Sequence, residues 1–296
     1  MSEASMSGAG GWRLGAFALV FLVMAGWELV EPWRAGAPRR SRRWPTNFAL
    51  AAMDAVLVRL VLPVGAIGVA WLTAQRGWGL LPLLPIPGWV AGLLAVLALD
   101  LAIYGQHVAF HAVPWLWRLH RVHHADEHMD ASTGVRFHPV EALLSLGWKI
   151  VAIVLLGASP GAVFVFELLL NLSSLFNHGN VSLPRWLEPL ARWLIVTPGM
   201  HRVHHSCERA EHDSNFGFNL PWWDRLFGTY RAEAAAGNQI RFGLAELWAQ
   251  PTDSLPWALR APFGRAPADF ERTERGTPTP DPTHPAGVGL DERARR

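Results

Sequence analysis

Histidine is concentrated in one part of this chain, and most of it stands in short repeated strings. Eleven of the 13 histidines lie between His107 and His205. The strings are HVAFH at 107–111 and HRVHH at both 120–124 and 201–205. Neutral imidazole is the commonest side-chain ligand for metals such as iron, zinc and copper, so this density of histidine predicts a metal site.

The spacing within the strings is helical. Residues four apart on a helix point the same way, and this holds for the first and last histidines of each string. In each HRVHH string the histidine three residues on lies on that face too. Helices of this kind can aim eight imidazoles at one place: His107, His111, His120, His123, His124, His201, His204 and His205. Eight ligands exceed the four of a tetrahedral metal, which predicts two metals with open positions for a small molecule.

Long apolar runs flank the histidine strings. The chain is 51% hydrophobic and 17% charged, and its apolar residues gather in blocks long enough to span a bilayer. The second block is broken by Pro63 and carries Asp54 and Arg59. We therefore expect an all-α integral membrane protein with about three single spans, a helical hairpin that crosses or re-enters the membrane, and a histidine-rich helical cap holding a di-metal site. The single spans are expected at Leu14–Val30, Asn47–Thr73 and Gly88–Tyr104, and the hairpin at Ala142–Leu156 and Gly161–Phe176.

Charge bias predicts how these spans are oriented. Five arginines stand in the short stretch 34–43, and short basic loops stay on the cytoplasmic side of a membrane. With that loop inside, the following spans return every histidine string to the cytoplasmic side. Because Lys149 is the only lysine, the arginine bias also fits a GC-rich bacterial genome. We expect a bacterial inner-membrane protein whose metal site faces the cytoplasm.

Composition divides the chain into five segments. A small and polar N-terminus precedes the first apolar run, and a tail rich in Pro, Thr, Arg, Asp and Glu, with His284, ends the chain. Low hydrophobicity with many charges is typical of disorder, which we expect for both ends. The segments are a disordered N-terminus at 1–11, transmembrane helices at 12–106, a histidine-box catalytic region at 107–232 that includes the membrane hairpin 142–176, a peripheral segment at 233–261 and a disordered tail at 262–296.

Several other classes of protein do not fit the sequence. Cys207 is the only cysteine, which excludes an intrachain disulfide. The basic stretches carry no interleaved aromatic residues, so we expect no nucleic-acid site. A zinc-dependent membrane hydrolase would need an HExxH string, which is absent. A metal transporter would place its ligands near the middle of its spans, whereas the histidine strings follow the spans. A membrane metal-handling protein is the non-enzymatic alternative.

Seven strings follow one another between about Asp100 and Tyr230. They are HVAFH, LHRVHH, RFHPVE, NHGN, TPGMHRVHH, HDSNFGFNL and WWDRLFGTY. In order and spacing they resemble the fatty acid hydroxylase / sterol desaturase superfamily of integral-membrane, histidine-box di-iron oxygenases. The resemblance implies that His178 of NHGN, which spacing does not select, joins the other eight as a ligand. The implied metal ligands are His107, His111, His120, His123, His124, His178, His201, His204 and His205.

Further polar residues stand within or beside these strings. His138 and His212 occupy positions similar to the family's, as metal ligands or as groups that support a ligand. A single histidine at an interface is also commonly a plain polar residue, and this alternative stays open for His138. Candidate acceptors for imidazole N–H groups are Glu141, Asp213, Asn215 and Asp100, and each also has a simpler role as a helix cap, interfacial group or turn residue. Asp224 is expected to tie the cap together through a neighbouring arginine.

The resemblance implies O₂-dependent attack on a C–H bond of a lipid that enters from the bilayer. Its cofactors would be two iron ions, with zinc as a substitute on the same nitrogens. The chain shows no GxGxxG unit and no CxxC motif. Electrons are therefore expected from a separate ferredoxin, cytochrome or flavin reductase. Hydroxylation of a lipid or an acyl or sterol-like substrate is expected first; desaturation and cleavage of an ether lipid are the alternatives within the superfamily.

Overall fold

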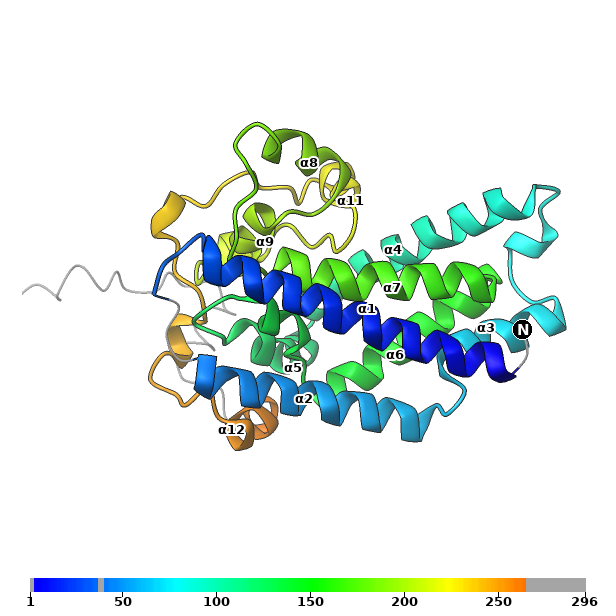
Figure 1. The fold of residues 1–296 in the computed structure, drawn as a ribbon, viewed down its shortest axis with the longest axis horizontal. Coiled ribbons are helices and arrows are strands. Elements are labelled where there is room, and N and C mark those ends of the chain that lie inside the picture. Colours follow the sequence, from blue (N-terminus) through cyan, green and yellow to red (C-terminus); the bar gives the residue numbers. More distant parts are fainter. Residues whose placement is uncertain (1–2, 37–39, 265–296) are drawn as a thin grey trace, which may run out of the picture. The chain divides into compact units, whose positions relative to one another are not determined.

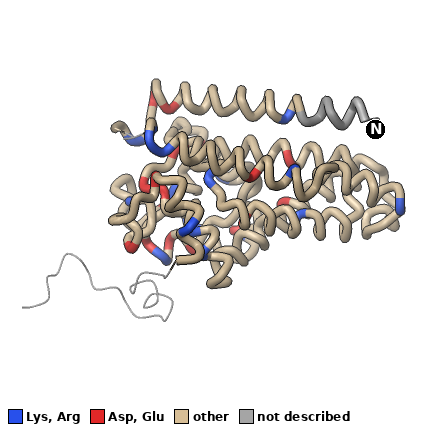
Figure 2. The backbone as a smooth tube through the Cα atoms, turned by 90° about the horizontal axis from the view of Figure 1, so that it is seen from below, with Lys and Arg blue, Asp and Glu red and all other residues tan. Residues whose placement is uncertain are grey.

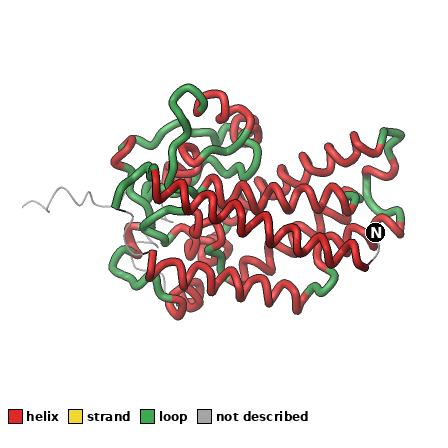
Figure 3. Tube along the Cα trace, viewed as in Figure 1, coloured by secondary structure: helices red, strands yellow, loops and turns green. Residues whose placement is uncertain are grey.

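The computed structural model describes residues 3–36 and 40–264, and within them the fold is helical (Figure 3). The only strand-like pairing in these residues is an isolated antiparallel bridge between Ser206 and Phe242. Five segments of the described chain are long and apolar enough to cross a membrane. They are Gly11–Val30, Arg40–Leu83, Gly88–Ala112, Pro139–Leu156 and Pro160–Asn177.

Three helices come from the first two predicted spans: α1 (Glu3–Val30), α2 (Arg40–Val61) and α3 (Gly65–Arg76). The start of α1 falls inside the segment 1–11 that was predicted to be disordered, and no proline interrupts a helix there. The second span is divided between α2 and α3 because Pro63 has no N–H to donate and its ring clashes with the preceding turn. α2 begins at Arg40 rather than Asn47, so it includes three of the five arginines of the basic stretch.

The third span is longer than the sequence predicted. After the short turn η1 (Leu81–Leu83), α4 runs from Gly88 to Ala112 and therefore includes the first histidine string on its last two turns. The helix ends at Ala112, and the next residue, Val113, is extended because Pro114 follows it. The first histidine string is thus placed by the third long apolar helix itself.

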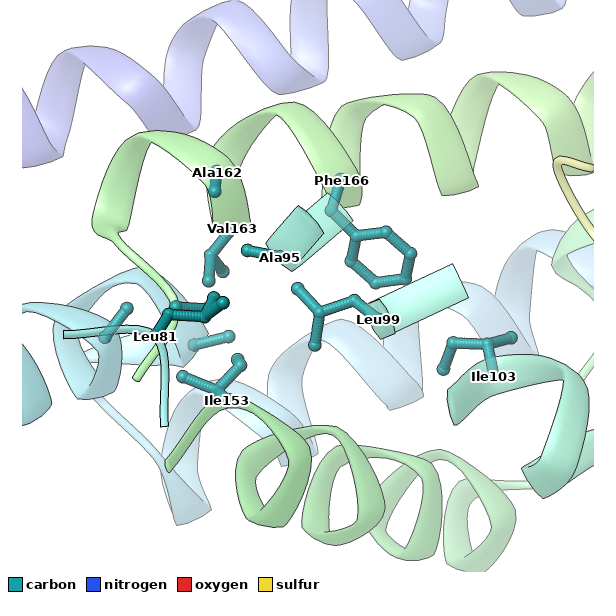
Figure 4. Close-up of a cluster of buried hydrophobic side chains, with 11 residues drawn as sticks. Leu81, Ala95, Leu99, Ile103, Ile153, Ala162, Val163 and Phe166 are labelled. Atoms are coloured by element: carbon teal, nitrogen blue, oxygen red, sulfur yellow. The ribbon is translucent and has the colours of Figure 1, made fainter. Parts of the chain in front are cut away.

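The predicted hairpin is present as α6 (Pro139–Leu156) and α7 (Pro160–Asn177). Gly157 ends α6 with a φ of 67°, a left-handed conformation that favours glycine, and the Ser159 side chain accepts a hydrogen bond from the backbone N–H of Ala162 at the start of α7. Leu99, Ile153 and Phe166 lie at the centre of the apolar core between α3, α4, α6 and α7 (Figure 4).

A cap of short helices covers one end of the bundle, where the labels α5 and α9 lie in Figure 1. It includes α5, which carries the second histidine string, and α9, which carries the third. The tail predicted from residue 262 begins inside η5, and residues 265–296, with His284, lie outside the described residues. The elements are α5 (Pro114–His124), η2 (Ala131–Val135), α8 (Glu188–Leu194), α9 (Pro198–His204), α10 (Arg209–His212), α11 (Trp222–Phe227), η3 (Gly237–Gln239), η4 (Ala245–Leu247), α12 (Leu255–Arg260) and η5 (Ala261–Phe263).

Charged residues gather at the cap end of the molecule (Figure 2). The guanidinium of Arg43, at the start of α2, donates two hydrogen bonds to Asp126 at 2.6 and 2.7 Å and one to Asp130 at 2.9 Å, all in buried positions. Glu28, near the end of α1, accepts hydrogen bonds from the backbone N–H groups of Ala131 and Asn180. The basic stretch and the histidine-bearing cap therefore share one end of the bundle.

Candidate metal centre

The structure brings the nine predicted ligands together as two adjacent groups. The first contains His107, His111, His120, His124 and His204, and the second contains His123, His178, His201 and His205. Within each group the nearest ligand nitrogens all lie within 4.8 Å of one another, and every one of the nine side chains is buried.

Four elements supply these imidazoles. α4 supplies His107 and His111, and α5 and α9 supply the two HRVHH strings. His205, the last histidine of the second of these strings, directly follows α9. His178 is the residue that ends α7. Two histidines that are neighbours in sequence go to different groups, as with His123 and His124, because side chains one residue apart on a helix diverge. The repeated doublet therefore divides each string between the two groups.

Most of the imidazoles are oriented by a hydrogen bond from their Nδ1 atom. His107 donates to the Phe216 carbonyl at 2.8 Å, and His178 donates to the Ser174 carbonyl at 2.7 Å. A carbonyl oxygen can only accept, so Nδ1 carries the proton and Nε2 is left with a lone pair. The other Nδ1 contacts are His120 to Glu141 at 2.6 Å, His123 to the Arg136 carbonyl at 3.2 Å, His204 to the Ser214 carbonyl at 2.8 Å and His111 to Asp213 at 3.2 Å.

This protonation pattern leaves lone pairs facing one another. Nε2 of His107 lies 3.1 Å from Nε2 of His120, and Nε2 of His123 lies 3.1 Å from Nε2 of His178. With both Nδ1 atoms protonated in each neutral pair, neither Nε2 has a proton to donate. Two lone pairs at this distance repel each other unless a cation lies between them. Two nitrogens each about 2.1 Å from one metal, and at a right angle, are about 3.0 Å apart, so the spacing fits shared metal ligation.

Several further ring nitrogens have no partner among the described residues. They include Nε2 of His111, His204 and His205, Nδ1 of His201 and both nitrogens of His124. A buried polar atom without a hydrogen bond costs about 1–3 kcal/mol, so this concentration of unpaired nitrogens calls for a bound group that accepts lone pairs. The residues present therefore fit metal ions, and the all-nitrogen donor set suits iron or zinc.

Burial keeps the cap histidines neutral. It lowers the pKa of His120 and of His178 to about 3. Burial also lowers the pKa of His124 and of His205 well below the usual histidine range, and nearby imidazoles lower each pKa further: His205 acts on His124, and His123 acts on His205. Neutral imidazole is the form that ligates metals, so at pH 7 these side chains need not lose a proton to bind one.

One short segment, 213–216, orients three histidines of the first group. The Asp213 carboxylate contacts His111, the Ser214 carbonyl accepts from His204, and the Phe216 carbonyl accepts from His107. Between them Asn215 has a φ of 52°, and its side chain donates to the carbonyls of Met200 and Arg231. Asn215, predicted as an acceptor for imidazole, instead fixes the backbone conformation that presents those carbonyls.

Asp224 fixes the same segment from the other side. Its carboxylate accepts hydrogen bonds from the backbone N–H groups of Phe216 and Gly217 at 2.7 and 2.8 Å, and from the Thr229 hydroxyl at 2.6 Å. It was expected to pair with an arginine, but these three donors occupy it instead. Burial raises the pKa of Asp224, while these hydrogen bonds act in the opposite direction.

The remaining candidates have other partners. Nε2 of His138 donates to the Leu259 carbonyl, and its Nδ1 accepts from the backbone N–H of Val140 at the start of α6. His212 donates to the Ser206 carbonyl and stacks on Trp117, next to the first group but outside it. Asp100 accepts from Asn219, Leu220 and Trp223, which ties the loop before α11 to α4.

A cavity of about 340 Å³ opens onto the first histidine group from inside the bundle. His107 and His120 line it. Around that end three phenylalanine rings lie against histidine rings. The distances between ring centroids are 5.8 Å from Phe110 to His120, 4.6 Å from Phe137 to His123 and 5.8 Å from Phe218 to His107. The sequence did not single out these rings, although Phe110 lies inside the string HVAFH, Phe137 inside RFHPVE and Phe218 inside HDSNFGFNL, because no spacing sets them apart from other apolar residues.

Residues 92–229, which include both histidine groups, match the family described as Fatty acid hydroxylase. This part of the chain belongs to the fatty acid hydroxylase family. The match covers α5, α6, α7 and α9 completely, so the two groups and the hairpin between them lie within the fatty acid hydroxylase region. No solved structure gives a significant match.

Several characterised proteins are similar to the chain. An ornithine lipid hydroxylase of Rhizobium tropici is 33% identical over 146 residues, which are 48% of this chain and 43% of that protein. An alkylglycerol monooxygenase of Xenopus tropicalis is 28% identical over 76% of this chain and 48% of its own length. The human cholesterol 25-hydroxylase is 29% identical over 47% of this chain and 50% of its own length. The chain thus spans about half the length of these members of the fatty acid hydroxylase superfamily.

Proposed function

We propose that this chain is a membrane-bound di-iron oxygenase that uses O₂ and external electrons to hydroxylate a lipid or an acyl or sterol-like substrate. The observation that carries the proposal is the contact between the histidine groups and the cavity. His107 and His120 belong to the first group and also line the space between the membrane helices. A molecule in that cavity would therefore lie against the proposed metal ligands.

The chain's own residues would prepare this site. Two bound iron ions would supply activation of O₂ and oxidation of an unactivated C–H bond. Hydrogen bonds from Nδ1 hold six of the nine imidazoles in one tautomer, and such support from outer groups commonly decides metal affinity. The rings of Phe110, Phe137 and Phe218 would exclude water and present hydrocarbon to the metals.

The comparisons support a lipid substrate. The three relatives are named for oxidation of an ornithine lipid, an alkylglycerol and cholesterol. Electrons would come from a separate ferredoxin, cytochrome or flavin reductase. We further propose that the cap faces the cytoplasm of a bacterial cell, where such donors are found. This orientation is supported by the arginines of the stretch 34–43, which lie at the cap end.

The test is lipid profiling of host membranes with and without the expressed chain, under air and under isotopically labelled O₂. Hydroxylation predicts one labelled oxygen gained by a membrane lipid. Loss of two hydrogens without label would instead make the chain a desaturase, and release of a fatty aldehyde would indicate ether cleavage. An unchanged lipid profile in cells that also supply a reductase, with metal bound, would overturn the oxygenase and favour metal handling.

The ligand set is tested with His124→Ala and His205→Ala. These two stacked imidazoles belong to different groups, with ring centroids 4.5 Å apart. Each substitution should abolish lipid oxidation and lower the metal bound per chain, measured by elemental analysis of the purified protein. Full activity in both variants would show that the histidine groups are not the oxidation site.

A further inference from the structure

The cavity beneath the first histidine group is not uniformly apolar. Phe110, Phe137 and Phe218 surround its metal-facing end, and polar side chains stand among the apolar ones that line the rest of it. On α6 these are Glu141, Ser145 and Lys149, and on α7 they are Glu167, Asn171 and Ser174. The intervals of four and four residues on α6, and of four and three residues on α7, put each set on one face of its helix. Polar residues inside a membrane are costly, and their alignment along a cavity indicates a bound polar group.

Charged side chains meet at the end of the cavity away from the histidines. The Glu167 carboxylate accepts hydrogen bonds from Lys149 and from Arg13 of α1, both at 2.6 Å. One carboxylate is thus shared by two cations, which leaves this cluster with one unbalanced positive charge. Both cations line the cavity and retain N–H groups that Glu167 does not use.

A carboxylate from another helix faces the same cavity. Asp54 of α2 lines it, and its buried Oδ1 atom has no hydrogen-bond partner among the described residues. The structure records no ion pair between Asp54 and any described cation, although Lys149 and Arg13 line the same space. The cavity is therefore lined by a carboxylate of α2 that has no ion-pair partner among the described residues and by unbalanced positive charge from α1 and α6.

Helix geometry places these charges at a similar depth. Lys149 follows Glu141, the hydrogen-bond partner of His120, by eight residues, which is about 12 Å along α6. Glu167 precedes the ligand His178 by eleven residues, or about 16 Å along α7. On α2, Asp54 follows Arg43 by eleven residues, again about 16 Å. Arg43 marks the cap end, because its partner Asp126 lies just beyond α5. The charged end is therefore well separated from the metal-facing end.

We propose that the cavity binds an amphiphile whose polar group is zwitterionic, with its anionic part on Lys149 and Arg13, its cationic part on Asp54 and its hydrocarbon against the histidine group. The inference rests on the proposed function for the identity of the reaction, and it adds the substrate class and the carbon attacked. Oxidation falls on the hydrocarbon segment among the three phenylalanine rings, and the polar group stays about 12 Å or more away.

Binding of four synthetic amphiphiles to the metal-loaded protein in detergent tests the proposal. They share a hexadecanoyl or hexadecyl chain: Nα-hexadecanoyl-lysine is zwitterionic, N-hexadecanoyl-glycine is anionic, hexadecylamine is cationic and methyl hexadecanoate is neutral. Hydrogen bonds to charged groups contribute about 1.5–3 kcal/mol, so the zwitterion should bind at least about tenfold more tightly than either singly charged amphiphile. Equal binding of all four would overturn the proposal.

Substitutions assign each charge to its side chain. Lys149→Met should weaken the zwitterionic and anionic amphiphiles and leave the cationic one unchanged, and Lys149→Arg should restore binding. Asp54→Asn should weaken the zwitterionic and cationic amphiphiles only. Arg59→Gln is the matched control, because Arg59 lies on α2, donates to the Pro63 carbonyl and does not line the cavity. A uniform loss for all four amphiphiles in either variant would show a structural role and contradict the assignment.

This test separates the two proposals. Binding is measured without turnover, so a chain that prefers the zwitterion but oxidises no lipid fails only as an oxygenase. A chain that oxidises lipids regardless of their polar group, and binds the four amphiphiles equally, fails only as a zwitterion-selective protein.

Discussion

At the scale of single residues, the hydrogen bond made by Nδ1 of a histidine determines whether its Nε2 atom carries a proton or a lone pair. In the pair His107 and His120, one Nδ1 donates to a backbone carbonyl and the other to Glu141, so both Nε2 atoms present lone pairs at 3.1 Å. An isolated histidine at a membrane interface has no reason to be held this way. The arrangement distinguishes a ligand set from a group of polar residues that merely share a location.

The effect of substituting Asn215 should depend more on the backbone preference of the new residue than on the size of its side chain. Its φ of 52° is accessible to Asn and Gly, but strained for a β-branched residue by about 1–3 kcal/mol. Asn215→Val should therefore lower both the melting temperature and the metal content, measured by calorimetry and elemental analysis. Asn215→Gly, which keeps the conformation and loses the side-chain hydrogen bonds, should lose less. Equal losses in the two variants would show that the backbone conformation is unimportant.

The two histidine groups should lose metal separately. His178→Ala removes one of four ligands from the second group, and His111→Ala removes one of five from the first. We expect each variant to retain about half of the metal bound by the unsubstituted chain, because a site missing a ligand binds more weakly. Elemental analysis measures this, with His284→Ala as the control. Complete loss of metal in both variants would mean that the groups form one inseparable site.

Residue spacing predicted eight of the nine grouped histidines, and the family resemblance supplied His178. Spacing could not supply it, because His178 stands alone in its string and joins the others only through the path of α7. Glu141 and Asp213 were named as imidazole acceptors and do contact His120 and His111. Glu167 was missed altogether, since one acidic residue in an apolar run shows no partner until α1 and α6 are placed beside α7.

At the scale of elements, α12 and η5, which follow α11 in the chain, pack against α5 and α2. Ala258 of α12 packs against Leu50 and Val122 in a small buried cluster. The Leu259 carbonyl accepts from His138, and the Ala261 carbonyl accepts from Arg121, so this segment also occupies two polar side chains near the second histidine string. This role was not predictable from the sequence, because 233–261 has neither a motif nor a regular period.

Two truncations should therefore behave differently. A chain ending at Gly264 keeps α12 and η5 and should retain its metal content and melting temperature. A chain ending at Ser254 loses the packing of Ala258 and two carbonyl acceptors, so its metal content and its melting temperature should both fall. The expected loss of unfolding free energy is about 2–4 kcal/mol. Thermal unfolding and elemental analysis measure the outcome. The expectation is contradicted if the shorter chain matches the longer one.

Element boundaries were the least predictable part of the fold. Apolar runs located every long helix, because burial in lipid or in the core imposes one composition on a whole span. α4 nevertheless continues through His107 and His111 to Ala112, past the predicted end of the span. Its last two turns carry two histidines whose side chains are buried, and tertiary burial of this kind cannot be read from local hydropathy.

At the scale of the molecule, the basic stretch and the histidine groups share one end of the bundle. If the arginines orient the chain, a fluorescent protein fused to the C-terminus should fluoresce, because it folds in the cytoplasm. Alkaline phosphatase fused to the N-terminus should be active, because it needs the periplasm. The opposite pair of signals would reverse the proposed topology.

Metal should also stabilise the whole helical cap, since ligands come from α4, α5, α7 and α9. Metal present at about 100 times its dissociation constant adds about 2.7 kcal/mol to the folded state, equivalent to about 5–10 °C in melting temperature for a protein of this size. Chelation should lower the melting temperature by this amount, and re-addition of iron(II) should restore it. An unchanged transition after complete metal removal would count against a site shared by four elements.

The carbonyl groups of segment 213–216 have a consequence for how such a protein can be re-engineered. Because Ser214 and Phe216 orient histidines through main-chain oxygens, many replacements of their side chains would leave the reactive centre unaltered. Phe110 and Phe137, which line the cavity and would contact a bound substrate, belong to other parts of the chain. A combinatorial library directed at those rings would therefore vary which molecules the cavity admits and leave the proposed metal ligands unchanged. This separation favours the acquisition of new specificities.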